Sequence, residues 1–183
     1  MKRLRPLTSL RCASAGAVLA GALFAGTAVT PQRATAAAGT SISTLGALNI
    51  GVLAQLNEIR IAHGLAPLKL NAGLSAAAAQ HSAEMITDGY FAHDSRDGTV
   101  FWKRLLRFYP LAGSSRWAVG ENLLQASGPI TATQAMARWM ASPEHRANVL
   151  NPTWREIGVS AVAGSATSGS VVIVITTDFG VRT

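Results

Sequence analysis

The sequence contains a single cysteine, Cys12, among 183 residues. A disulfide framework and a cysteine-rich metal centre are therefore excluded. Charged residues are also scarce, at 14% of the chain against 49% for apolar residues, a balance typical of a folded chain rather than a disordered one. Only one long uncharged apolar stretch exists, so a polytopic membrane protein is excluded as well.

Familiar catalytic signatures are missing too. The chain has no G-x-S-x-G, no H-E-x-x-H, no glycine-rich phosphate loop and no C-x-x-C. The motifs of the common enzyme classes therefore say nothing about its activity, and any function must rest on less common groupings of polar residues.

The N-terminal 1–36 segment has the pattern of a secretory signal peptide. Basic residues precede an uncharged run over 12–30, and small residues follow over 34–38. We expect cleavage after Ala36 or Ala38 and a secreted, extracellular protein. The alternative is an uncleaved membrane anchor, since the uncharged run is at the short limit for crossing a bilayer.

Removal of this segment changes the charge of the protein. The full chain carries a formal charge of +7, but five of its sixteen basic residues and none of its nine acids lie in 1–36. The mature chain therefore carries eleven basic and nine acidic groups, which gives +2. We therefore expect no nucleic-acid partner.

The remaining sequence predicts a flexible lead-in over 37–44 and one domain over 45–183. Helical spacing of apolar residues predicts several helices, and alternation or β-branched runs predict strands. The helices are expected from Leu45 up to His63, from the N-cap Asn71 to Gly89, over 101–108, over 131–141, and from a Ser142 cap to Asn151. The strands are expected over 118–124, 157–162 and 171–175, with a flexible loop at 164–169. A sheet between layers of helices is the simplest way to bury all these faces.

Three polar residues stand out from these patterns. His93 follows two aromatic residues, Glu121 interrupts an apolar segment, and His145 lies in the first turn of a helix, where the imidazole should stay neutral. Each also has a structural explanation: His93 could hold the turn that follows it, Glu121 could pair with an arginine, and His145 could be a surface residue. His81 on an apolar helix face and His63 at a helix end are expected to be structural.

The order of several motifs resembles the CAP superfamily, also called the SCP or PR-1-like domain, in its bacterial, cysteine-poor branch. The motifs are YFAHDSRDG, GEN and SPEHRANVLNPTWREIGVS, and the resemblance runs from about Leu45 to Gly180. It implies an α+β fold, a three-layer α-β-α sandwich with a mainly antiparallel sheet. It also implies a cleft that gathers His93, Glu121 and His145.

These three residues are the expected metal site, because two histidines and a glutamate can bind Zn²⁺ with one open position. Many family members have a fourth acid after the tryptophan of the preceding helix; here Trp139 is followed by Met140, Ala141 and Ser142. Three hypotheses follow. The first is a binding module for an extracellular ligand, such as a lipid or a cell-wall component. The second is a zinc-assisted, peptidase-like hydrolase, and the third is a purely structural polar network.

Overall fold

The computed structural model describes residues 41–165 and 170–183. The predicted signal peptide, both cleavage positions, Cys12 and most of the predicted loop at 164–169 lie outside these residues. None of the described helices has the length and apolar character needed to cross a membrane.

Helices and strands follow one another in a mixed order along the chain. They are β1 (Ile42–Thr44), α1 (Gly46–Ala62), β2 (Lys69–Leu70), α2 (Ala72–Thr87), α3 (Phe101–Phe108), β3 (Trp117–Ser127), α4 (Ala132–Ala141), α5 (Pro143–Val149), β4 (Glu156–Ser165) and β5 (Val171–Arg182). The predicted helices are therefore present, with ends that differ by a few residues at most.

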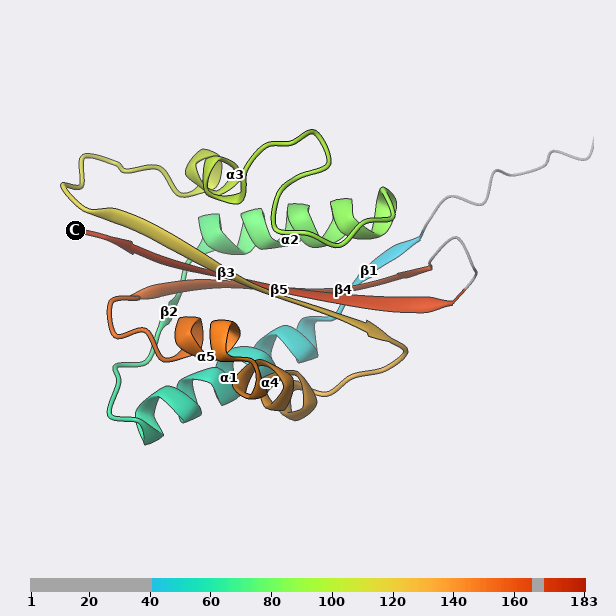
Figure 1. Cartoon of the computed structure of the whole chain (residues 1–183), viewed down its shortest axis with the longest axis horizontal. Helices are drawn as coiled ribbons and strands as arrows, with labels where there is room; N and C mark the ends of the chain where they lie inside the picture. Colours follow the sequence, from blue (N-terminus) through green and yellow to red (C-terminus); the bar gives the residue numbers. More distant parts are fainter. Residues whose placement is uncertain (1–40, 166–169) are drawn as a thin grey trace, which may run out of the picture. The chain divides into compact units, whose positions relative to one another are not determined.

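The strands form one sheet in the order β1-β4-β5-β3. All pairs are antiparallel except the short pair of β2 with β4. Helices α2 and α3 cover one face, and α1, α4 and α5 cover the other (Figure 1). The prediction of a three-layer α-β-α sandwich with a mainly antiparallel sheet is confirmed. In this part of the chain β3 is an edge strand, so both helical layers can reach its free side.

Local sequence explains how the helices begin. The Asn71 side chain accepts a hydrogen bond from the Leu74 amide at 3.1 Å, as an N-cap should. Thr131 and Gln134 form a reciprocal capping box at the start of α4. Ser142 occupies the N-cap position of α5, but its side chain makes no capping bond, contrary to the prediction. Ser142 also ends α4, so one residue joins the two helices.

The sheet extends beyond the predicted strands in several places. Residues 42–44 belong to the predicted flexible lead-in, yet they form β1 and pair with β4, with Ser43 opposite Ala163. Strand β4 also continues through Gly164 and Ser165, which the sequence assigned to the loop. In both places main-chain pairing, which leaves no periodic signal in so short a segment, extends the sheet.

Strand β5 continues beyond the predicted end at Ile175, as far as Arg182. The apolar run that predicts the strand stops there because Thr176, Thr177 and Asp178 are polar, but all three are fully buried. Thr176 is satisfied by Ser82 of α2, whose hydroxyl donates to it at 2.8 Å. The polar end of β5 therefore lies inside the protein, beneath α2.

Helix α2 lies directly against the sheet because β4 carries a glycine beneath it. A Cβ atom at Gly158 would lie 2.1 Å from the carbonyl carbon of Leu74, so no larger residue fits. Across the sheet, Gly158 is paired with Asp178 of β5. This close approach seals Asp178 from solvent.

Candidate functional site

Glu121 is the centre of the candidate site. It lies in the middle of β3, on the face covered by α2 and α3, and its side chain is 1% exposed. Its Oε1 atom is 2.7 Å from Nδ1 of His93, and its Oε2 atom accepts a hydrogen bond from Nη2 of Arg104. The sequence left open that Glu121 pairs with an arginine; the structure shows this pair and shows that both side chains are buried.

Arg104 compensates the buried negative charge. It comes from α3, and its side chain is also only 1% exposed. Besides bonding Glu121, it donates through Nη1 to the main-chain oxygen of His93 at 2.8 Å. One guanidinium therefore fixes both the carboxylate and the segment that carries the histidine. No pattern in the sequence indicates this role, because Arg104 lies between other basic residues on a short amphipathic helix.

His93 is the part of this network that solvent reaches. Its side chain is 52% exposed, and its ring lies 6.3 Å from that of Phe101. The hydrogen bond to Glu121 is the main reason that the pKa of His93 is raised above its ordinary value. The turn after His93 is held by Asp94, whose carboxylate accepts from the Phe101 amide, and not by the His93 ring.

His145 reaches the same region from the other helical layer. It belongs to α5, and its main-chain oxygen accepts a hydrogen bond from the Asn122 side chain of β3 at 3.0 Å. Asn148 donates to the Glu121 carbonyl at 3.1 Å and to the Asn122 side chain at 2.9 Å, which ties α5 to the free side of β3. Burial, followed by the positive charge of His93, lowers the pKa of His145. The resemblance implies that His93 and His145 share a cleft; no hydrogen bond joins their side chains among the described residues, and the shared site stays a prediction.

Asp178 is a fourth residue of this site that the sequence did not reveal. It lies opposite Glu121 in the β3–β5 pair and is completely buried. Within the described residues, no amide, guanidinium or hydroxyl group donates a hydrogen bond to either of its carboxylate oxygens. Burial, followed by the negative charge of Glu121, raises its pKa well above the ordinary value for aspartate. Two carboxyl groups and one guanidinium thus share a buried space, which favours the protonated form of Asp178.

The residues present do not fit the three-ligand zinc centre implied by the resemblance. Both oxygens of Glu121 are already engaged, one by His93 and one by Arg104. Among residues 41–165 and 170–183, no group of three or more His, Cys, Asp and Glu side chains is arranged to hold a metal ion. Glu121 has the position of a residue that orients a histidine from behind. These contacts do not support the three-ligand zinc site, and zinc binding and the hydrolase that depends on it stay predictions.

The other two histidines have the local contacts expected of structural residues. His81 is buried in α2, and its Nε2 atom is 2.9 Å from the carbonyl oxygen of Ala92. Burial is the main reason that its pKa is lowered. His63 is exposed at the end of α1, with Nδ1 2.8 Å from the Ile59 carbonyl oxygen. Both rings thus bond main-chain oxygens close to their own helix.

Fold and site together define a class: an α-β-α domain with a buried glutamate that positions a half-exposed histidine at a sheet edge. The family model described as "CAP: Cysteine-rich secretory protein family" matches residues 53–178. The chain therefore belongs to the CAP family, in a form whose matched region contains no cysteine.

Individual relatives agree with this membership. The chain is 33% identical over 129 residues to the "Uncharacterized protein YkwD" of Bacillus subtilis, and the match covers 70% of this chain and 46% of that protein. It therefore spans less than half the length of this relative.

Solved structures show the same fold. An outer surface protein from Borrelia burgdorferi matches with a TM-score of 0.60 and 18% identity, covering 78% of this chain and all of that one. An extracellular protein containing a SCP domain from Bacillus anthracis matches with a TM-score of 0.55 and 25% identity, covering 71% of this chain and 40% of that one.

Proposed function

We propose that the protein is an exported CAP-domain binding module that holds an anionic group of a cell-envelope component at His93 and His145. Export is supported by the signal-peptide pattern and by relatives described as outer surface and extracellular proteins. The observation that carries the binding role is the buried Glu121–Arg104 pair, which fixes a half-exposed His93 ring.

The hydrogen bond between Glu121 and His93 determines what the ring can offer a ligand. An ionised carboxylate only accepts hydrogen bonds, so Nδ1 of His93 is the donor in this pair. The Nε2 atom is then the ring nitrogen left for a ligand. Because the pKa of His93 is raised, the ring more readily carries a proton on Nε2 and can donate it to a carboxylate or phosphate oxygen.

His145 complements this donor. Its lowered pKa favours the neutral ring, so it offers a hydrogen-bonding group without a second positive charge. Positioning costs little at the moment of binding, because Arg104 donates to the main-chain oxygen of His93 and Asn122 donates to that of His145. Carboxylates and phosphates occur in lipid headgroups and in wall polymers, so the shared chemistry is the anionic group itself.

A sedimentation assay tests this function and separates the two sources. The protein is mixed with phosphatidylglycerol vesicles, with phosphatidylcholine vesicles or with purified peptidoglycan sacculi. We expect it to sediment with one of the anionic materials, to lose several-fold affinity in the His93→Gln variant, and to remain in solution with the zwitterionic vesicles.

The matched control is His63→Gln, which changes another exposed histidine at the far end of α1. It should bind as tightly as the unchanged protein. Equal binding by the His93→Gln variant, with its circular dichroism spectrum unchanged, would contradict the proposed site. Binding to neither anionic material would contradict the proposed ligand.

A further inference from the structure

A cavity that is lined by neither His93 nor His145 lies where α2 ends before the strands beneath it do. Helix α2 stops at Thr87, and Gly89 turns the chain away with φ of 66°. Strand β3 continues to Ser127, and β5 begins at Val171. Among residues 41–165 and 170–183 no helix covers the end of the sheet on this face, and a cavity of about 460 Å³ lies there.

The floor and one wall of this cavity are apolar and already in place. Val174 of β5 and the last turn of α2, with Met85 and Ile86, form its inner surface. These three residues are buried at 2 to 8% exposure, so the surface does not depend on mobile side chains. Phe91, which is 46% exposed, also lines the cavity. The volume is within the range of small-molecule sites.

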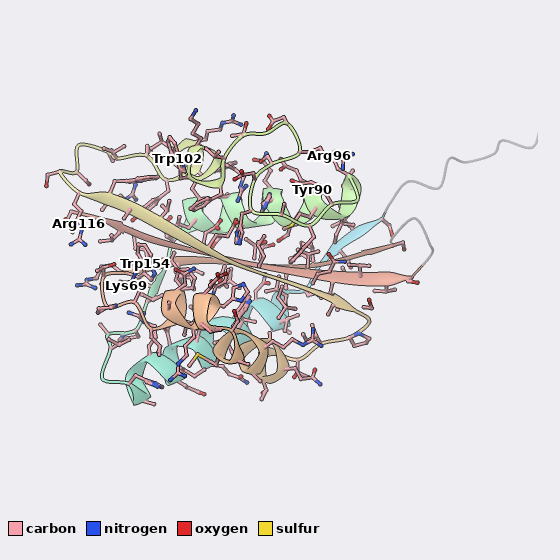
Figure 2. All side chains as sticks on the ribbon, viewed as in Figure 1. Lys69, Tyr90, Arg96, Trp102, Arg116 and Trp154 are labelled. Atoms are coloured by element: carbon pink, nitrogen blue, oxygen red, sulfur yellow. The ribbon has the colours of Figure 1, made fainter. Side chains whose placement is uncertain are left out.

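The wall formed by Tyr90 and Phe91 is held from behind. The Tyr90 amide donates to the Met85 carbonyl at 3.1 Å, and the Tyr90 ring packs edge-on against His81 at 6.1 Å. His81 in turn bonds the Ala92 carbonyl. Figure 2 shows Tyr90 beside α2, with Arg96 further along the same loop. The cavity is therefore preformed, which lowers the cost of binding.

The charge of the rim is negative. Among the described lining residues Asp88 is the only ionisable acid or base apart from the phenol of Tyr90, and it is exposed. Within the described residues no Lys or Arg forms an ion pair with its carboxylate; Arg96 donates instead to the Asp88 main-chain oxygen at 3.2 Å. An apolar surface beside a carboxylate that forms no ion pair with the described residues favours a ligand with a hydrophobic part and a cationic group.

We propose that this cavity, lined by Met85, Ile86, Asp88, Phe91, Gln125 and Val174, is a binding site for a small amphiphile with an ammonium group. The hydrophobic part packs on Met85, Ile86 and Val174, and the ammonium group lies against Asp88. This site goes beyond the proposed function, because it uses neither His93 nor His145 and its ligand has the opposite charge.

Calorimetric titration with octylammonium, octanol and octanoate, each below its micelle-forming concentration, tests the site. The three probes share a chain and differ in the charge of the head. We expect saturable binding of octylammonium with one site per chain, with an affinity about threefold above that of octanol, as suits an exposed charge pair. Octanoate should bind more weakly than octanol. Chemical-shift changes should centre on the methyl groups of Ile86 and Val174.

Three variants make the test specific. Asp88→Asn should remove the preference for octylammonium over octanol, whereas Glu58→Gln, an exposed acid on α1, should leave it unchanged. Gln125→Trp, at an exposed lining position, should fill the cavity and weaken binding of octylammonium and octanol alike, with an unchanged thermal melting curve. No saturable binding of either probe, or tighter binding of octanoate, would overturn the proposal. So would an ammonium preference that survives Asp88→Asn.

Discussion

The face of the sheet beneath α2 and α3 buries Arg104, Glu121 and Asp178, whereas the face beneath α1 and α4 buries side chains such as Leu56 and Trp139. Both faces exclude water equally well, since these residues are exposed by 5% or less. They differ in what burial does. On the apolar face burial contributes free energy directly, while on the polar face each buried charge needs a compensating partner.

This difference assigns the two faces different tasks. The apolar core is continuous from α1 through the sheet to α4 and α5. Arg60 of α1 is buried on the same side, where its guanidinium donates to the main-chain oxygens of Val149 and Asn151. Arginine does not lose its charge in the ordinary pH range, so the stability of this side should vary little with pH. The polar face orients one surface histidine and shifts the pKa values of its neighbours. The polar network is therefore concentrated on one side of the sheet. His145 belongs to the other helical layer and is connected to this network only along the free edge of β3.

The largest effect should follow removal of the buried cation. Arg104→Met leaves Glu121 buried without its guanidinium, which we expect to cost about 3–5 kcal/mol of unfolding free energy. Urea unfolding at neutral pH measures this loss. Arg107→Met on the same helix is the matched control, because Arg107 is exposed and should change stability by less than about 0.5 kcal/mol. Similar small losses in both variants would show that the buried pair is not needed.

A cavity on the apolar face should cost somewhat less and should respond differently to pH. Leu56 is fully buried, so Leu56→Ala should lower the unfolding free energy by about 3 kcal/mol. The loss should be the same at pH 5 and pH 8, since no ionisable group is removed. A loss that varied strongly with pH would contradict the claim that only the polar face makes stability depend on pH.

Asp178→Asn should stabilise the protein. The pKa of Asp178 is raised in the folded state, so the folded chain holds this proton after the unfolded chain has released it. Stability is therefore lost as pH rises from the unfolded value near 3.8 towards the folded pKa. Asparagine cannot ionise, so the variant avoids this loss. At high pH its unfolding free energy should be greater by about 1.4 kcal/mol for each pH unit by which folding raises the pKa of Asp178. Urea unfolding from pH 4 to pH 8 should show that the unfolding free energy of the variant rises relative to that of the unchanged protein as pH increases. A difference that stayed constant with pH would contradict this.

The smallest effect should come from the exposed member of the network. His93→Gln removes a half-exposed side chain, so it should cost at most about 1 kcal/mol. Because the pKa of His93 is raised on folding, its contribution is fully present below pH 6.5 and is lost as pH rises through the folded pKa. Thermal melting at pH 5 should therefore reveal a loss that vanishes at pH 9. A loss that grew with pH would reverse the sign of the interaction.

The apolar face could be predicted from the sequence, and much of the polar face could not. Val52 and Leu56 recur at helical spacing because both face the core, where they are fully buried. Burial of apolar residues thus leaves a periodic trace that identifies the helix and its inner surface. Apolar residues also predicted strand β4, through their alternation, and the first half of β5, through an unbroken β-branched run.

Polar burial leaves no such trace. Asp178 follows two threonines and looks like the end of a strand, since only its position opposite Glu121 and beneath α2 shows that it is buried. Arg104 resembles its exposed neighbours Lys103 and Arg107 on α3. Both roles depend on residues distant in sequence, which periodicity does not connect. His93, Glu121 and His145 each stood out in the local sequence, but only the family resemblance grouped them into one site.

The most direct test is a pH titration of the histidine ring signals of His93 and His145 by nuclear magnetic resonance. If Glu121 and Arg104 hold His93 as described, its pKa lies above 6.5 and that of His145 lies below 6.5. The Asp88→Asn variant, which is altered at the proposed amphiphile site, should give the same pKa values for both histidines. Equal pKa values for both histidines, or the reverse order, would contradict a site in which a buried carboxylate prepares one histidine to bind an anion.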